Sequence, residues 1–181
     1  IQENINSSTG EGMEMLPFYN IFNEWYAAQT SKKIRAVWQS KADNGKRVSP
    51  VVPYGYKKDE TDKEKWLIDE PAAEIVKKIY SLCLAGRGPL QIAKQLEREK
   101  VLVPTAYFES VGRKTRNTTP LDPYAWHPSA VVGILENRQY TGCAVNFKTT
   151  TVSYKVHTRI INPVEDYQII PNMQEPIISE D

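Results

Sequence analysis

Several signatures of enzyme chemistry are missing from this sequence of 181 residues. Cysteine occurs twice, as Cys83 and Cys143, and neither belongs to a CxxC pair, so we expect no zinc site within this segment. Histidine also occurs only twice, as His127 and His157. Neither lies near a serine in a GxSxG turn, and Walker, HExxH and GxGxxG motifs are missing as well. The sequence therefore predicts no cofactor, no metal and no catalytic residue in this chain.

Long apolar runs are missing too. None approaches the roughly 20 residues that a helix needs to cross a bilayer, so we expect no membrane partner. Residues 1–12 are polar and acidic and do not resemble a secretory signal, which makes a reducing cytoplasm the expected location for two unpaired cysteines. Because the chain begins on Ile1 rather than on Met, we expect it to be a segment of a longer protein.

The charge that is present is unevenly distributed, although the net charge is only +1. Residues 32–58 contain eight Lys and Arg residues against Asp43 alone, whereas residues 59–70 contain six acidic residues and two lysines. Such asymmetry indicates an anionic partner for the basic stretch. The alternative is a solvated, lysine-rich helix face.

A long helix is predicted over residues 17–42, with Pro17 in its first turn and Asp43-Asn44-Gly45 as its stop signal. At 1.5 Å per residue it would be about 39 Å long. Its apolar residues form two stripes, rotated by more than a quarter turn from each other, so the helix is expected to bridge two bodies. Phe18, Ile21, Phe22 and Trp25 form the first stripe, and Ile34, Val37 and Trp38 form the second.

Beyond this helix the pattern predicts an α+β domain. Residues 47–56 are extended, and a hairpin follows with its turn over 57–65 and its return strand over 66–68. Helices are expected from about 69 to 86, 89 to 99 and 128 to 136, separated by a polar loop over 104–125. Strands are expected over 143–147, 152–161 and 167–170, with turns near Thr149 and at Asn162-Pro163. Three short helices with small antiparallel strands favour a winged-helix-like domain, and any small α+β domain is the alternative.

An ordered series of motifs resembles the large serine recombinases of mobile elements. Residues 22–37 (FNEWYAAQTSKKIRAV) resemble the long helix that leaves their catalytic domain. Pro53-Tyr54-Gly55-Tyr56 is similar to the entry of their recombinase domain. Residues 68–73 and 92–96 resemble the first two helices of that domain. Residues 126–142 resemble its third helix and the strand after it. Residues 175–178 resemble the segment that precedes a zinc ribbon. The resemblance covers residues 17–181.

The resemblance implies that the parent protein cuts and rejoins two DNA sites. In that family a serine hydroxyl attacks a phosphodiester and forms a 5′-phosphoserine link. The nucleophile is expected near the N-terminus of the full protein, outside this segment, so the segment alone is expected to be inactive. The chain departs from the family pattern at His127, where a small hydroxylated helix cap is usual.

The resemblance also implies a division of the chain into four parts. Residues 1–16 would be the tail of the catalytic domain, and residues 17–45 the long linker helix. Residues 46–150 would form the recombinase DNA-binding domain. Residues 151–181 would be a strand-rich segment that leads to a zinc-ribbon domain outside this chain.

Double-stranded DNA is the expected partner, because cations dominate binding to its phosphates. The arm over residues 45–56 is expected to follow the minor groove, with Arg47 as the best candidate for that groove. The helix that opens at His127 is expected to present its first side chains to base edges. The expected DNA contacts are Lys32, Lys33, Arg35, Lys41, Lys46, Arg47, Tyr54, Arg113, Lys114, Arg116, His127, Ser129, Arg138 and Tyr140.

Several alternatives stay open. Trp126 is interpreted as a core residue rather than a stacking platform, and His127 as a capping or surface residue rather than a base reader. The chain could instead be a regulatory DNA-binding module, or an oligomerisation domain in which Phe18, Phe22 and Trp25 mediate assembly. A small enzyme has almost no support. Self-association is also expected of the recombinase, as a dimer or tetramer of the full-length protein.

Overall fold

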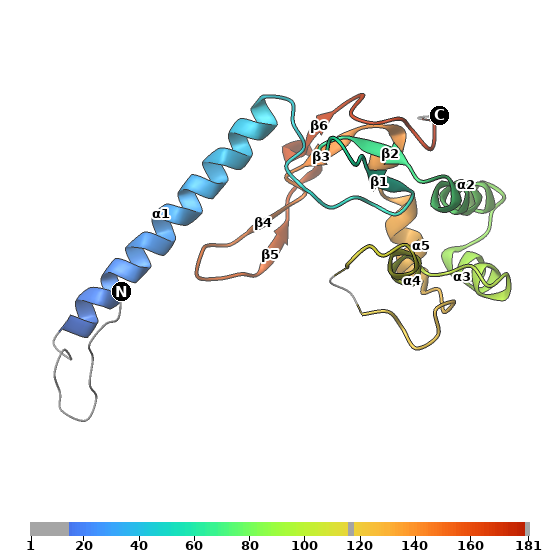
Figure 1. Ribbon diagram of the computed structural model, residues 1–181, viewed down its shortest axis with the longest axis horizontal. Coiled ribbons are helices and arrows are strands. Elements are labelled where there is room, and N and C mark those ends of the chain that lie inside the picture. The colour runs from blue at the N-terminus through green and yellow to red at the C-terminus, as the bar shows by residue number, and fades with distance from the viewer. Residues whose placement is uncertain (1–14, 116–117, 180–181) are drawn as a thin grey trace. The chain divides into compact units, whose positions relative to one another are not determined.

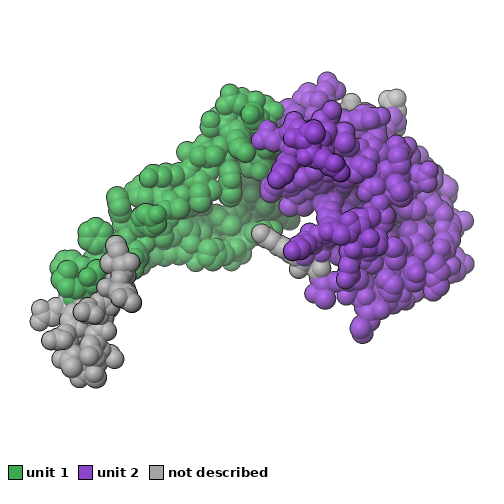
Figure 2. Space-filling model, in the orientation of Figure 1, with its two compact units in different colours: residues 1–48, 146–168 green, residues 49–145, 169–181 purple. Residues whose placement is uncertain are grey.

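The computed structural model describes residues 15–115 and 118–179, and it confirms the α+β class (Figure 1). The chain divides into two compact units, coloured separately in Figure 2. Unit 1 comprises residues 1–48 and 146–168, and unit 2 comprises residues 49–145 and 169–181. Unit 1 thus combines the long helix with residues 146–168.

Unit 1 is built on the long helix α1 (Leu16–Asp43), which confirms the predicted helix to within one residue at each end. Pro17 lies in its first turn, where the missing N–H costs no helical hydrogen bond. Asn44 ends the helix, and Gly45 follows in the left-handed region with a φ of 66°. The helix stops here because glycine tolerates that conformation without a Cβ clash.

The second part of unit 1 is a hairpin of β4 (Thr149–Thr151) and β5 (Arg159–Ile161), followed by the short 3₁₀ helix η3 (Val164–Asp166). The strands are antiparallel, with Thr149 opposite Ile161. The prediction of one strand over 152–161 after a turn near Thr149 is wrong, because the turn lies over residues 152–158. The Ser153 hydroxyl accepts from the backbone N–H groups of Lys155 and Val156 and thereby holds that turn.

The described residues of unit 2 contain four α-helices, one more than predicted. The helices α2 (Glu70–Leu84), α3 (Pro89–Arg98) and α5 (Pro128–Leu135) confirm the three predicted ones. The fourth, α4 (Pro104–Ser110), lies inside the stretch predicted as a polar loop. Its seven residues bury only Ala106, so the sequence carries little helical periodicity there.

Three two-stranded sheets occur in the described parts of the chain. The hairpin of β1 (Tyr56–Lys58) and β2 (Trp66–Ile68) confirms the predicted one, with Tyr56 opposite Ile68. The Asp59 carboxylate accepts from the N–H and the hydroxyl of Thr61, which stabilises the turn and lowers the pKa of Asp59. The third sheet pairs β3 (Ala144–Asn146) with β6 (Gln168–Ile170).

The hydrophobic core belongs to unit 2. Tyr56 and Tyr140 stack with ring centroids 6.2 Å apart and are almost completely buried. Trp126 is 5% exposed and donates from Nε1 to the carbonyl of Val101 over 2.9 Å, which confirms its interpretation as a core residue. From the C-terminal segment, Ile177 joins the same core. The helices contribute Ala72, Ala73, Val76, Ile79, Ile92, Ala93, Leu96, Ala106, Val131 and Ile134.

None of the helices within the described ranges is both long enough and apolar enough to span a membrane. The longest, α1, carries polar residues along its length and cations from Lys32 onward.

Candidate nucleic-acid interface

The basic stretch of unit 1 is exposed. Lys32, Lys33 and Arg35 lie along the middle of α1, and Lys41 lies in its last turn. One guanidinium nitrogen of Arg35 is 3.5 Å from the carbonyl oxygen of Thr151 on the hairpin of the same unit. That distance is at the limit of a hydrogen bond, so the Arg35 charge is available to another partner.

At the end of α1 two of the predicted contact residues come together. Ser40, Lys41, Asn44 and Lys46 line one surface hollow. Lysines 41 and 46 therefore place two ammonium groups beside a helix C-terminus, whose dipole favours positive charge. Arg47, the next residue, is only half-exposed.

Asn146, which sequence reasoning missed, holds the backbone on both sides of Arg47. Its side-chain amide donates to the carbonyl of Lys46 over 3.0 Å, and its carbonyl oxygen accepts from the N–H of Val48 over 3.0 Å. Asn146 is 2% exposed, so the surrounding protein fixes this amide. It pairs with residues 46–48 as a neighbouring strand would. The signal that could have revealed it is a polar residue at a buried strand position.

The opening of α5 presents His127 and Ser129 to solvent. His127 is the N-cap of the helix, and its Nδ1 accepts from the backbone N–H of Ser129 over 3.3 Å. The same nitrogen lies 2.7 Å from the Ser129 hydroxyl oxygen. The imidazole thus performs the capping that a hydroxylated residue performs elsewhere, which confirms the capping interpretation. The two side chains form one exposed polar pair at the helix start.

Two predicted contact residues are core residues in the structure. Tyr54 is 6% exposed and Tyr140 is 1% exposed, and the Tyr140 hydroxyl donates to the Tyr54 carbonyl over 2.8 Å. Burial raises the pKa of both phenols well above the ordinary range. Because neither ring is available at the surface, we leave both tyrosines out of the interface proposed below.

Arg113 stabilises unit 2 from within. Its guanidinium donates to the carbonyls of Val52 and Tyr56, and it stacks over the Phe108 ring with the centroid 4.0 Å away. Partial burial lowers its pKa. Arg113 therefore ties the end of α4 to the segment that enters unit 2. The sequence alone could not show that Arg113 points inward, because a basic residue in a polar stretch can lie either at the surface or against the core.

The remaining predicted residues lie apart. Lys114 is exposed in the loop after α4, and Arg138 is exposed at the start of the 3₁₀ helix η2 (Arg138–Thr141). Arg116 lies outside the residues that the structure describes. Cys83 is exposed and Cys143 is buried, and no group of metal-ligating side chains occurs in the described part of the chain.

Sequence reasoning also missed three cations around α3. Arg87 lies in the turn before the helix, and Lys94 and Arg98 lie on its outer side. All three are exposed. Lys94 and Arg98 are four residues apart, which is a helical spacing, so a search for cations at that spacing would have found these two.

A family model described as Recombinase matches residues 70–181 of the chain. The match covers more than half of the chain and begins at the first residue of α2, so the chain belongs to the Recombinase family. No curated protein and no solved structure matches the chain. The family confirms that the motifs identified a recombinase, and it connects the chain to site-specific recombination.

Proposed function

We propose that this chain is the DNA-binding region of a serine-type site-specific recombinase and that it positions the enzyme on the attachment site of a mobile element. The observation that carries the proposal is the exposed basic stretch of a chain that belongs to the Recombinase family. Asp43 is the only carboxylate between residues 32 and 58. Few carboxylates within that stretch can therefore pair with its cations. Most of its positive charge can interact with an anionic partner.

Phosphate binding follows from this charge distribution. Each cation that neutralises a phosphate releases a condensed counterion, which makes the affinity dependent on salt. With about five phosphate contacts, the affinity is expected to fall a few hundred-fold between about 50 and 200 mM salt. The backbone of the arm around Arg47 is fixed by Asn146, so less conformational entropy is lost on binding than for a free arm.

Base reading is proposed for the opening of α5. Because His127 Nδ1 accepts from the Ser129 N–H, the Ser129 hydroxyl donates to that nitrogen and can accept from a donor on a base edge, with its geometry fixed by the imidazole. The helix is docked on the core of unit 2 through Val131 and Ile134, so its exposed side has a defined orientation within that unit. In the winged-helix-like interpretation, α5 is the recognition helix.

The first test is a salt titration of binding to short duplexes. The variant Lys46→Ala/Arg47→Ala should lower the slope of log affinity against log salt by about 1.8, because each lost phosphate contact removes about 0.9. The matched control is Lys63→Ala/Lys65→Ala, which removes two lysines from the acidic hairpin turn and should keep the wild-type slope. Wild-type binding no tighter than about 10⁻⁴ M at low salt would overturn the proposal, because ordinary non-specific DNA binding is tighter.

A second test separates base reading from phosphate binding. Ser129→Ala should reduce the preference for the attachment site over random duplex by about five-fold or more, with an unchanged salt slope. Ser110→Ala, at the C-terminus of α4, removes another exposed serine hydroxyl as a control. An equal preference for the attachment site in wild type and Ser129→Ala would show that Ser129 does not read bases. It would not contradict the proposed phosphate contacts.

Self-association is the second candidate function, and the exposed aromatic residues of α1 favour it. Phe18, Phe22 and Trp25 are between 56% and 66% exposed, and Ile21 lies beside them at 66%. Such contiguous apolar surface usually marks a protein contact. Sedimentation of Phe22→Ser/Trp25→Ser should show a smaller species than wild type, whereas Leu121→Ser, an exposed leucine of unit 2, should not. A wild-type chain that sediments as a monomer at high concentration would contradict this function.

A further inference from the structure

The outer face of α3 is a second basic surface, separate from the basic stretch of unit 1. Lys94 and Arg98 are exposed on this helix, one turn apart, and Arg87 precedes it. The opposite side of α3 is buried through Ile92 and Leu96. At 100° per residue, Lys94 and Arg98 point away from those two core residues. We call Arg87, Lys94 and Arg98 the α3 basic face.

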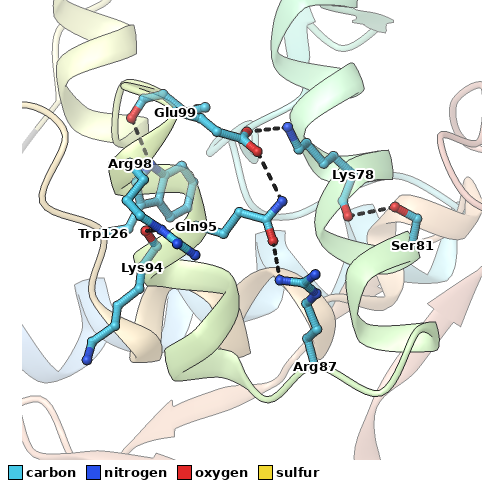
Figure 3. Close-up of polar contacts among 9 residues, drawn as sticks. Lys78, Ser81, Arg87, Lys94, Gln95, Arg98, Glu99 and Trp126 are labelled. Atoms are coloured by element: carbon cyan, nitrogen blue, oxygen red, sulfur yellow. Dashed lines mark hydrogen bonds and ion pairs between the residues drawn. The ribbon is translucent and has the colours of Figure 1, made fainter.

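A chain of polar contacts holds Arg87 in place, as Figure 3 shows. Its guanidinium donates to the side-chain carbonyl of Gln95 over 2.8 Å, and the Gln95 amide donates to the Glu99 carboxylate over 3.0 Å. Glu99 in turn forms an ion pair with Lys78 from α2. Gln95 therefore links Arg87 to Glu99, and within the described residues Arg87 forms no ion pair of its own.

The Glu99 carboxylate already has a cationic partner in Lys78. The hydrogen bond from Lys78, with that from Gln95, lowers the pKa of Glu99, so it stays ionised and bound to Lys78 near neutral pH. The Arg98 guanidinium lies along the helix, with Nε donating to the Lys94 carbonyl over 3.3 Å. Within the described residues, neither Lys94 nor Arg98 forms an ion pair with a carboxylate. Lys94 and Arg98 therefore remain able to contact an external anion, and Arg98 also attracts the Glu99 carboxylate.

We propose that the α3 basic face is a second phosphate-binding surface, through which unit 2 grips the backbone of a DNA duplex. This inference rests on the proposed function, in which the chain binds DNA. Lys94 and Arg98 are separated by about 6 Å along the helix axis, and the guanidinium of Arg87 lies beside Gln95, between them in sequence. Contacts of this kind add salt-dependent affinity and fix orientation, but they carry no sequence information.

A DNA duplex is favoured over an acidic protein because the chain belongs to the Recombinase family, and the side chains are compatible with phosphate. Two of the three cations are arginines, whose planar guanidinium groups match phosphate oxygens in a bidentate geometry. Arg87 is fixed by Gln95 before any ligand arrives, so it loses less side-chain entropy on binding than a free arginine.

The test is the salt titration of duplex binding by the full chain, with Lys94→Gln/Arg98→Gln compared against Lys63→Gln/Lys65→Gln. Both variants lose two positive charges, and all four side chains are exposed. The α3 variant should lower the slope by about 1.8, and the control should leave it unchanged. Circular dichroism melting checks that both variants fold.

A second variant tests the placement of Arg87 without changing the charge. Gln95→Leu removes the acceptor that holds the guanidinium, so it should weaken duplex binding several-fold at low salt. In a chain that already carries Arg87→Gln, adding Gln95→Leu should have no further effect, because the guanidinium that Gln95 positions is gone. An affinity of Gln95→Leu equal to that of wild type would overturn the role of Gln95 and Arg87.

The outcomes distinguish this inference from the proposed function. Tight, salt-dependent binding by wild type together with a wild-type slope for the α3 variant overturns the α3 contact and upholds DNA binding. An equal drop in slope for the α3 variant and its control also overturns it, because the loss would then follow net charge alone. Wild-type binding no tighter than about 10⁻⁴ M at low salt overturns both proposals.

Discussion

The two units of this protein use their apolar residues in opposite ways. In unit 2, residues from all four described helices, the β1–β2 hairpin and the C-terminal segment form one buried cluster that includes Tyr56, Trp126 and Tyr140. In the described part of unit 1, Ala42 and Asn146 are the only buried residues. The helix α1 has 28 residues and leaves its large apolar side chains in solvent.

This difference in apolar burial shows which unit has a hydrophobic core to stabilise it. Burial of apolar surface is the main favourable contribution to folding, and unit 2 has that burial. Unit 1 is held by polar contacts, such as the ion pair between Lys155 and Glu24 over 2.7 Å and the hydrogen bond from Gln168 to the Ala42 carbonyl over 2.9 Å. Exposed ion pairs contribute little. A unit of this kind is suited to bind partners along its apolar and basic surfaces.

The largest expected effect contrasts an aromatic residue from each unit. Tyr140→Ala should destabilise the protein by about 3–5 kcal/mol, because it leaves a cavity in the core and removes the hydrogen bond to Tyr54. Trp25→Ala, which removes a ring that is 59% exposed, should change the free energy of unfolding by less than about 0.5 kcal/mol. Denaturant unfolding followed by circular dichroism measures both. Equal losses would show that unit 1 has a core of its own.

A second contrast compares two glycines of unit 2. Gly142 has a φ of 87°, and a Cβ there would lie 2.8 Å from the Gln174 carbonyl oxygen, so Gly142→Ala should cost about 2 kcal/mol or more. Gly133 is an exposed position within α5 with open space around it, so Gly133→Ala should stabilise by about 1 kcal/mol. The unfolding midpoints should move in opposite directions, and a shift in the same direction would contradict this interpretation of the two sites.

The next contrast tests the one buried polar anchor found among the described residues of unit 1. Asn146→Ala removes both hydrogen bonds to the arm around Arg47. Exchange of the Val48 amide hydrogen should become about ten-fold faster or more, because a buried hydrogen bond is lost. Asn162→Ala removes a single bond to the Phe147 carbonyl and should leave Val48 unchanged. Unchanged exchange in Asn146→Ala would mean that the arm is held by other contacts.

Alkaline pH should weaken unit 2. Burial and the hydrogen bond to the Asp69 carboxylate raise the pKa of Tyr107 to about 12, and burial raises the pKa of Tyr54 further. The unfolded chain loses these protons near pH 10, whereas the folded chain keeps them, so stability should fall as the pH rises from about 10 to 12. Ultraviolet titration of tyrosinate measures the pKa values of the tyrosines in the folded protein, with the protein in denaturant as the reference. Tyrosines that all titrate near pH 10 in the folded protein would contradict the prediction.

The smallest effect is expected for the ion pair of unit 1. Both side chains of the Lys155–Glu24 pair are more than half exposed, so solvent screens the attraction. Lys155→Ala should leave the thermal unfolding midpoint unchanged within error. A clear decrease that Glu24→Ala reproduces would show that this contact, rather than exposed surface, holds the hairpin on α1.

Much of the secondary structure was predictable from local patterns. The helix boundaries of α1, α2, α3 and α5 follow from prolines at the helix starts and from Gly45 and Gly86 after the ends. The helix α4 escaped prediction because seven residues are too few to show a helical period. The turn at Ser153 escaped because the Ser153 hydroxyl and two backbone hydrogen bonds within residues 152–158 hold it. Both depend on contacts that a periodicity pattern does not contain.

By itself, the sequence determined the α+β class, the long helix, the basic stretch and the motifs of a recombinase. These properties are local or additive along the chain, so residue order is sufficient to reveal them. The tertiary structure decided which polar residues reach solvent. It placed Tyr54 and Tyr140 in the core, turned Arg113 onto backbone carbonyls and set Asn146 beside the arm. Such outcomes depend on groups that lie far apart in sequence and meet only when the core closes, because burial and hydrogen bonding are properties of the folded neighbourhood.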